Sequence, residues 1–66
     1  KEKALEFYLK SAEQGYDKSQ FAVGHFYEYG QGGLDINHDV AIEWYKKAAE
    51  QGHRGALKVL AEHTEE

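Results

Sequence analysis

The chain has 66 residues, no cysteine and a formal net charge of −4 at pH 7. This length allows one small domain, because a chain of this size buries only about 60% of the surface that it exposes when unfolded. The lack of cysteine excludes disulfides and thiolate metal sites. The acidic charge argues against nucleic acid or anionic lipid as partners. No apolar run is long enough to cross a membrane, so membrane insertion is not expected.

The first element is predicted to be a helix over residues 2–14. Apolar and small residues recur there with the spacing of one buried helix face. They are Ala4, Phe7, Tyr8, Ser11 and Ala12. Gly15 follows, at the position where a glycine ends a helix by adopting the left-handed conformation.

The second helix is predicted over residues 18–29. Asp17 is the expected N-cap, and Gln20 would complete a capping box with it. Gly24 lies inside this helix and weakens it, which predicts that a neighbouring helix approaches too closely for a side chain. The predicted buried face consists of Ser19, Ala22, Val23, Phe26 and Tyr27.

Three glycines within residues 30–33 end the second helix and predict a loop over residues 30–36. The loop is not expected to bind phosphate, because no strand precedes it and no Lys-Ser/Thr pair follows. Leu34 and Ile36 are expected to hold it against the core. Asn37 is the expected N-cap of the next helix.

The third helix, predicted over residues 38–51, repeats the first. The twelve residues from Ala41 to Gly52 match those from Ala4 to Gly15 at eight positions, with an offset of 37 residues. An offset of this size is typical of helical repeats. Trp44 and Tyr45 fall on the predicted buried face. The fourth helix is predicted over residues 54–63 and should bury Ala56, Val59, Leu60 and His63.

Four helices, short connections and an internal repeat predict an all-α fold. Each predicted buried face alternates bulky and small residues, as close antiparallel helix packing requires. We therefore expect an α/α solenoid segment of antiparallel helix pairs over residues 1–66. Solenoids usually need about three repeats for stability. The chain is thus expected either to associate with itself through its open repeat ends or to belong to a longer array.

These residues resemble the Sel-one-like repeat, a subclass of the tetratricopeptide-like helical repeats. The shared pattern is A-x-x-W/F-Y-x-K-A/S-A-E-Q-G, with a small residue four positions after the glycine. In the second copy it is carried by Ala41, Trp44, Tyr45, Lys47, Ala48, Ala49, Glu50, Gln51, Gly52, Ala56 and Leu60. In the first copy it is carried by Ala4, Phe7, Tyr8, Lys10, Ala12, Glu13, Gln14, Gly15, Ser19, Gln20, Val23, Gly24, Tyr27, Gly30 and Gly32. The resemblance implies a scaffold for protein–protein interactions and brings no catalytic residues with it.

We expect neither an enzyme nor a cofactor or metal site. His25 and Glu28 are three residues apart on a helix and could form half of a metal site, but no second pair matches them. Ser11 and Ser19 lie on predicted buried faces. They are therefore interpreted as small residues at helix contacts rather than as nucleophiles.

The resemblance places a partner-binding surface on the second and fourth helices, because the first helix of each tetratricopeptide-like repeat lines the concave face. The residues predicted to contact a protein or peptide there are Gln20, Phe21, His25, Glu28, Leu57, Lys58 and Glu62. Phe21 is the expected anchor, although packing against a neighbouring repeat suits it equally well. Two alternatives stay open: a domain that binds a small or sugar-like ligand, and a regulatory domain attached to an enzyme in a longer chain.

Overall fold

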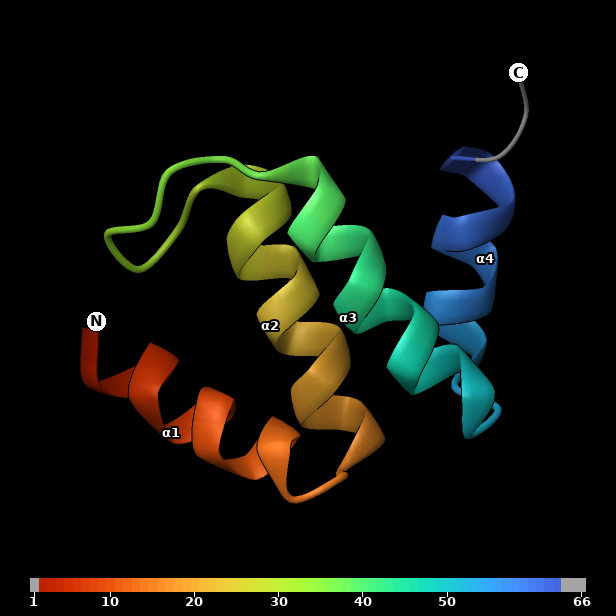
Figure 1. The fold of residues 1–66 in the computed structure, drawn as a ribbon, viewed down its shortest axis with the longest axis horizontal. Coiled ribbons are helices and arrows are strands. Elements are labelled where there is room, and N and C mark those ends of the chain that lie inside the picture. The colour runs from red at the N-terminus through yellow and green to blue at the C-terminus, as the bar shows by residue number, and fades with distance from the viewer. Residues whose placement is uncertain (1, 64–66) are drawn as a thin grey trace.

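The computed structural model describes residues 2–63, which form four α-helices and no strand (Figure 1). The helices are α1 (Glu2–Glu13), α2 (Asp17–Tyr29), α3 (His38–Glu50) and α4 (Arg54–His63). The predicted bounds differ from these by one residue at three helix ends. The expectation of an all-α fold built from four helices is confirmed. None of the described helices is both long enough and apolar enough to span a membrane.

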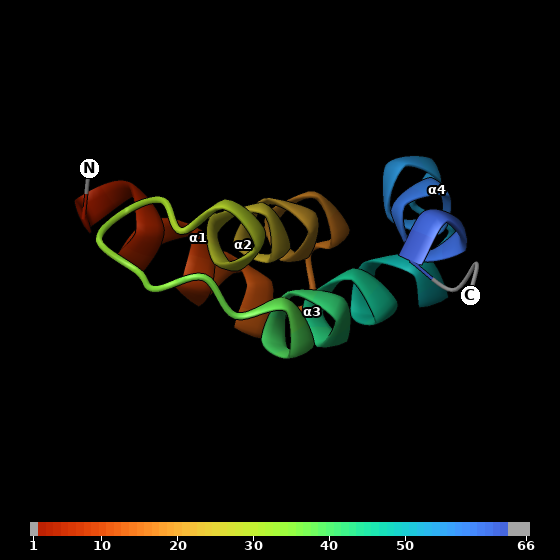
Figure 2. The ribbon, with the colours of Figure 1, turned by 90° about the horizontal axis from the view of Figure 1, so that it is seen from above.

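Consecutive helices run in alternating directions (Figure 1). The helix α3 lies between α2 and α4, and α1 lies on the other side of α2. Seen from above, α2 and α4 share one edge of the molecule and α3 lies along the opposite edge (Figure 2). This staggered order is the arrangement expected of a solenoid segment.

The helices α1 and α3 end in the same way. The φ angle is +101° at Gly15 and +88° at Gly52, a conformation that residues with a side chain rarely adopt. After each glycine, the next amide donates to a carbonyl five residues earlier: Tyr16 N–H to Ser11 O at 3.3 Å, and His53 N–H to Ala48 O at 3.2 Å. The predicted glycine stops are confirmed.

The predicted N-caps have different outcomes. Asn37 caps α3 as expected, because its Oδ1 accepts the Val40 N–H at 3.2 Å. The prediction of a capping box formed by Asp17 and Gln20 is wrong, because the N-cap position of α2 is Tyr16 and no side chain caps the helix there. Asp17 is already inside the helix and accepts only the N–H of the next residue, at 2.9 Å.

The core lies where α2, α3 and α4 meet, around four buried residues: Ala41, Tyr45, Ala48 and Ala56. Half-buried side chains that pack against this cluster are Phe21, Tyr27, Ala49, Val59 and Leu60. Tyr45 is the largest fully buried side chain, whereas the neighbouring Trp44 is only half-buried. The pattern predicted both aromatics to be buried, and only Tyr45 occupies the core.

The close approach predicted at Gly24 is confirmed. A Cβ atom built on this residue would lie 2.5 Å from Cε1 of Tyr45 and 2.7 Å from its Cδ1. The aromatic ring therefore rests directly on the backbone of α2. No residue other than glycine leaves room for this contact at the observed helix separation.

Several positions that the helical pattern predicted to be buried are exposed. Phe7 is 66% exposed and Ala4 is also exposed, because α1 packs mainly on α2, whereas α3 packs on both α2 and α4. Leu5 is buried instead, close to the glycine-rich loop at Gly32. The expected anchoring of that loop is half right, since Leu34 is half-buried and Ile36 is 60% exposed.

Candidate partner-binding surface

A row of aromatic side chains runs along one face of α2. Phe21, His25 and Tyr29 are four residues apart, which places them on the same side of a helix. The ring of His25 lies 4.5 Å from that of Phe21 and 5.5 Å from that of Tyr29, measured between centroids. Tyr29, at the end of the row, is 58% exposed.

His53 extends this row across to α4. Its imidazole stacks on Phe21 with centroids 4.5 Å apart, and its Nδ1 accepts the Ala56 N–H at 3.1 Å. His53 thus caps α4, which the sequence reading missed, although a polar side chain directly before the helix was the available signal. A Cβ on Gly55 would lie 3.1 Å from Phe21 Cζ, so this glycine allows the two helices to approach each other. We call Tyr29, His25, Phe21 and His53 the ring row.

The ring row rests on Tyr45. The centroid of the Tyr45 ring lies 5.4 Å from that of Phe21 and 5.7 Å from that of His25. Phe21 is consequently half-buried and packs against the core. The sequence allowed Phe21 either to anchor a partner or to pack against a neighbouring repeat. In the structure it packs against its neighbours, and it is half-buried.

Glu28 connects three helices at the upper end of the ring row. Its Oε1 accepts the Tyr45 hydroxyl at 2.5 Å, and its Oε2 lies 3.2 Å from His63 Nε2 on α4. Burial alone would raise the pKa of Glu28, but the hydrogen bonds from Tyr45 and His63 and the charges of nearby histidines lower it below its ordinary value. Burial, together with the same carboxylate, raises the pKa of the Tyr45 phenol. Glu28 is therefore an anion, and Tyr45 its neutral donor, at neutral pH.

The polar residues predicted on α4 correspond, in the repeat, to residues of this row. Lys58 and Glu62 are exposed and stand 37 residues after Phe21 and His25, on the matching face of α4. Figure 2 shows α2 and α4 along the same edge of the molecule. The repeat offset and helix periodicity thus predict that Lys58 and Glu62 lie on the side of α4 that corresponds to the Phe21 and His25 side of α2.

Gln20, also predicted to contact a partner, is only 6% exposed. Its Nε2 donates to Ala12 O at 3.1 Å, and its Oε1 accepts from Gln51 Nε2 at 3.0 Å. Gln51 Nε2 also donates to Gly15 O at 2.8 Å. The prediction that Gln20 contacts a partner is therefore wrong. Its amide is buried, and its hydrogen bonds join the two copies of the repeat.

Leu57, the last of the predicted contact residues, is 49% exposed. It stands 37 residues after Gln20, so it corresponds to the inward side of α2 rather than to the ring row. The structure therefore places it on a different face of α4 from Lys58 and Glu62.

The family model for the Sel1 repeat matches residues 1–16 and 17–53. The chain belongs to the Sel1 repeat family. The second match spans α2, the glycine-rich loop and α3, so these elements make up one complete repeat. In the same register, α1 is the second helix of one repeat and α4 the first helix of another.

Two curated relatives contain similar Sel1 repeats. The chain is 40% identical over 57 residues to the chitin synthase regulator SKT5 of Saccharomyces cerevisiae, a match that covers 86% of this chain. It is 31% identical over 51 residues to the ERAD-associated E3 ubiquitin-protein ligase component HRD3A of Arabidopsis thaliana, covering 77% of this chain. The chain spans 8% of the length of each of these proteins. No solved structure matches it.

The Sel1 pattern positions have structural roles. Tyr45 and Ala48 form the core, Gln51 joins the two copies, and Gly15 and Gly52 end helices. Residues 2–63 contain no pocket and no group of three His, Asp or Glu side chains that could hold a metal ion. The ring row and its charged neighbours are therefore the most distinctive surface that the described chain offers.

Proposed function

We propose that this Sel1 repeat segment is a protein-interaction module, and that the face shared by α2 and α4 binds a segment of a partner protein. The observation that carries the proposal is the ring row, which holds aromatic side chains in a fixed order and leaves Tyr29 58% exposed at its end. Rigid aromatic side chains lose little conformational entropy on binding, and they are enriched among residues that dominate binding energy.

The residues of this face would have different roles. Tyr29 and His25 would offer ring surface to the partner, and Phe21 would form the floor beneath them. Lys58 and Glu62 would provide a charged rim, which contributes to register and association rate more than to affinity. Gln20 and Leu57 are outside this proposed surface.

The names of the relatives support a more specific form of this proposal. SKT5 is named as a regulator of chitin synthase and HRD3A as a component of a ubiquitin ligase. We propose that the present segment is likewise the interaction module of a protein that regulates an enzyme or is a component of an enzyme complex. The segment itself would perform no catalysis. The small-ligand alternative has no comparable support, because residues 2–63 enclose no pocket.

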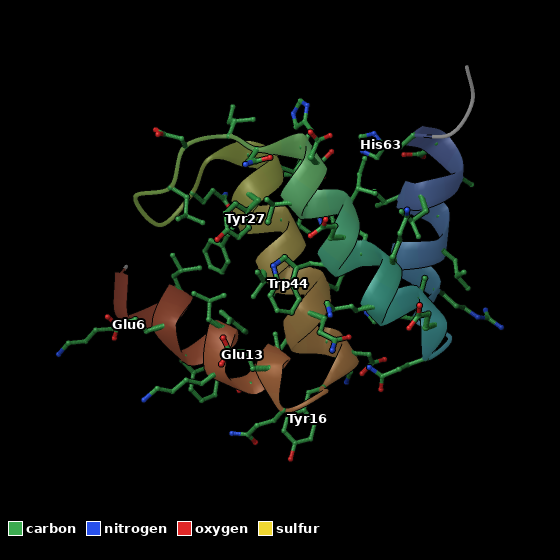
Figure 3. All side chains as sticks on the ribbon, in the orientation of Figure 1. Glu6, Glu13, Tyr16, Tyr27, Trp44 and His63 are labelled. Carbon is green, nitrogen blue, oxygen red and sulfur yellow. The ribbon has the colours of Figure 1, made fainter. Side chains whose placement is uncertain are left out.

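Selection of peptides from a displayed random library would test the proposed surface. We expect peptides selected against the unmodified chain to lose affinity for Tyr29→Ala and Lys58→Glu variants. The matched control is Tyr16→Ala, since Tyr16 is 61% exposed but lies at the turn between α1 and α2, at the far end of α2 from Tyr29 (Figure 3). Peptides that bind both test variants as tightly as the unmodified chain would move the interface elsewhere, provided that circular dichroism shows intact helices.

A further inference from the structure

We propose that His53 is a pH-sensitive latch: its unprotonated ring holds the first turn of α4 against Phe21 of α2, and protonation of the ring releases that turn. All the contacts involved lie within residues 17–56. Three features of the molecule carry the proposal: the atom through which His53 caps α4, the burial of the amide that it caps, and the composition of the helix start.

The cap requires an unprotonated nitrogen. The Ala56 N–H donates to Nδ1 of His53 at 3.1 Å, so this nitrogen carries no proton in the structure. A protonated imidazole donates from both of its nitrogens and accepts at neither. Turning the ring over does not help, because no acceptor is then present on either side. The positive charge and the cap therefore exclude each other.

The capped amide cannot turn to water instead. Ala56 has no exposed surface and belongs to the core cluster with Tyr45 and Ala48. The first amides of a helix have no carbonyl of their own helix to bond. Because a buried amide without an acceptor is costly, protonation of His53 favours movement of the first turn of α4, which lets water reach the Ala56 N–H.

The start of α4 has little else to stabilise it. Gly55 weakens the helix, but a Cβ there would lie 3.0 Å from Cε1 of His53 and 3.1 Å from Cζ of Phe21, so glycine makes room for both rings. The first turn of α4 contains no acidic residue, whereas that of α3 contains Asp39. A positive charge at a helix start is unfavourable, and nothing in this turn offsets it.

Stacking on Phe21 acts in the opposite direction. The two ring centroids are 4.5 Å apart and the planes differ by 28°, and a positively charged ring gains attraction from the face of an aromatic one. The same ring position, however, directs Nδ1 of His53 at the Ala56 N–H. Two donors would face each other there after protonation, so the stack cannot keep its present geometry.

His53 contacts three helices, through the Phe21 ring of α2, the Ala48 carbonyl of α3 and the Ala56 amide of α4. The charged or titratable residues closest to these contacts along each helix are Asp17, Lys18 and His25 on α2, Glu50 on α3, and Arg54 and Lys58 on α4. Within residues 2–63, none of them forms an ion pair with His53. No carboxylate of the described chain therefore compensates for the lost cap.

Acid is expected to open the latch. Histidine side chains gain their proton in the range from about pH 8 to about pH 5. Since the uncapped form is the one that accepts the proton, the closed latch is favoured at the upper end of this range and the open latch at the lower end. Opening uncovers the face of Phe21 on which His53 lies. Its effect on a partner of the ring row rests on the function proposed above, whereas the latch itself does not.

The cap of α3 provides an internal reference for the test. Oδ1 of Asn37 accepts the Val40 N–H at 3.2 Å, three residues along as in the His53 cap, but an asparagine amide does not titrate. Nuclear magnetic resonance can measure hydrogen exchange of both capped amides, corrected for the intrinsic pH dependence of exchange. Between about pH 7.5 and about pH 5.5, the protection of Ala56 relative to Val40 should fall about fivefold, the size of effect that loss of a cap has. Global unfolding would affect both amides alike.

Two variants assign the response to His53. His53→Asn keeps a cap that does not titrate, so the protection ratio should be independent of pH. His25→Asn is the matched control, because His25 is also a histidine in contact with Phe21, with centroids 4.5 Å apart, and it does not cap α4. This control should keep the response. A constant ratio in the unmodified chain overturns the proposal, and so does a response that persists in His53→Asn or disappears in His25→Asn.

Discussion

At the scale of single residues, Tyr45 is the centre of the molecule. Its ring lies on the backbone of α2 at Gly24 and beneath Phe21 and His25, and its hydroxyl donates to Glu28. One side chain thus provides both the largest fully buried surface and the hydrogen bond that orients the carboxylate.

Gly24→Ala should destabilise the chain, although alanine is the better helix former by about 1 kcal/mol. The added methyl group would lie 2.5 Å from the Tyr45 ring, and overpacking of this kind costs roughly 1–3 kcal/mol. Urea denaturation of both chains measures the change. An unchanged or raised midpoint would show that α2 and α3 can separate without loss.

Tyr45→Phe should lower the free energy of unfolding by about 1–2 kcal/mol, because Glu28 loses its hydroxyl donor while staying largely covered. The matched control is Tyr8→Phe at the equivalent position of α1, where no comparable carboxylate contact is present in the described chain. That control should change stability by less than about 0.5 kcal/mol. Equal losses in both variants would contradict the role given to Glu28.

At the scale of elements, the chain depends on abrupt helix ends. Gly52 has a φ of +88° and no atom within 4 Å of the position where a Cβ would be. Substitutions there act through backbone conformation and not through contacts, which makes the site a direct test of the helix stop.

Gly52→Val should destabilise the chain by about 1–2 kcal/mol, because a β-branched residue resists positive φ. Gly52→Asn is the control, since asparagine tolerates this conformation better than other residues do. Thermal unfolding followed by circular dichroism compares the two. If valine and asparagine have the same effect, backbone conformation is not what the glycine provides.

Glu28 joins α2 to α3 and α4, and this linkage makes stability depend on pH. The pKa of Glu28 is lower in the folded chain than its ordinary value of 4.5. The stability that it contributes is therefore present above pH 4.5 and is lost as the pH falls through the folded pKa.

We expect the difference in unfolding free energy between the unmodified chain and Glu28→Gln to shrink as the pH is lowered from 6 to about 3. Glutamine retains an acceptor for Tyr45 but does not titrate. Taking the difference removes the contributions of the other carboxylates, which titrate in both chains. A difference that stays constant over this range would show that Glu28 has the same pKa in the folded and unfolded states.

At the scale of the whole molecule, the two inner helices are each packed on two sides, whereas the two outer helices each have one main packing neighbour, and α4 reaches α2 in addition through His63 and Glu28. Among the described residues, α2 contacts α1 and α3, and α3 contacts α2 and α4. Local opening needs less free energy where fewer packing contacts must be broken.

Backbone amides of α2 and α3 should consequently exchange with deuterium more slowly than those of α1 and α4. The measurement is hydrogen exchange at low micromolar concentration, so that association between copies does not protect the outer helices. Protection of the outer helices equal to that of α3 at low concentration would contradict this order of stability.

Much of the architecture was determined by the sequence itself. Four helices, the glycine stops at Gly15 and Gly52, the Asn37 cap and the close approach at Gly24 were all predicted, and the Sel1 pattern was recognised from the repeat. These features depend on residues within a few positions of each other, because hydrophobic spacing, capping and positive φ are local properties of the chain.

The tertiary structure decided which of two similar residues became part of the core. Phe7 and Trp44, Tyr8 and Tyr45, and Gln20 and Leu57 occupy equivalent positions and differ in exposure or in hydrogen bonding. It also decided that Phe21 lies beneath His53 and that Gln20 joins the repeats instead of meeting a partner. Burial is the physical reason, since it depends on which other helices lie against a face, and periodicity along one helix carries no information about them.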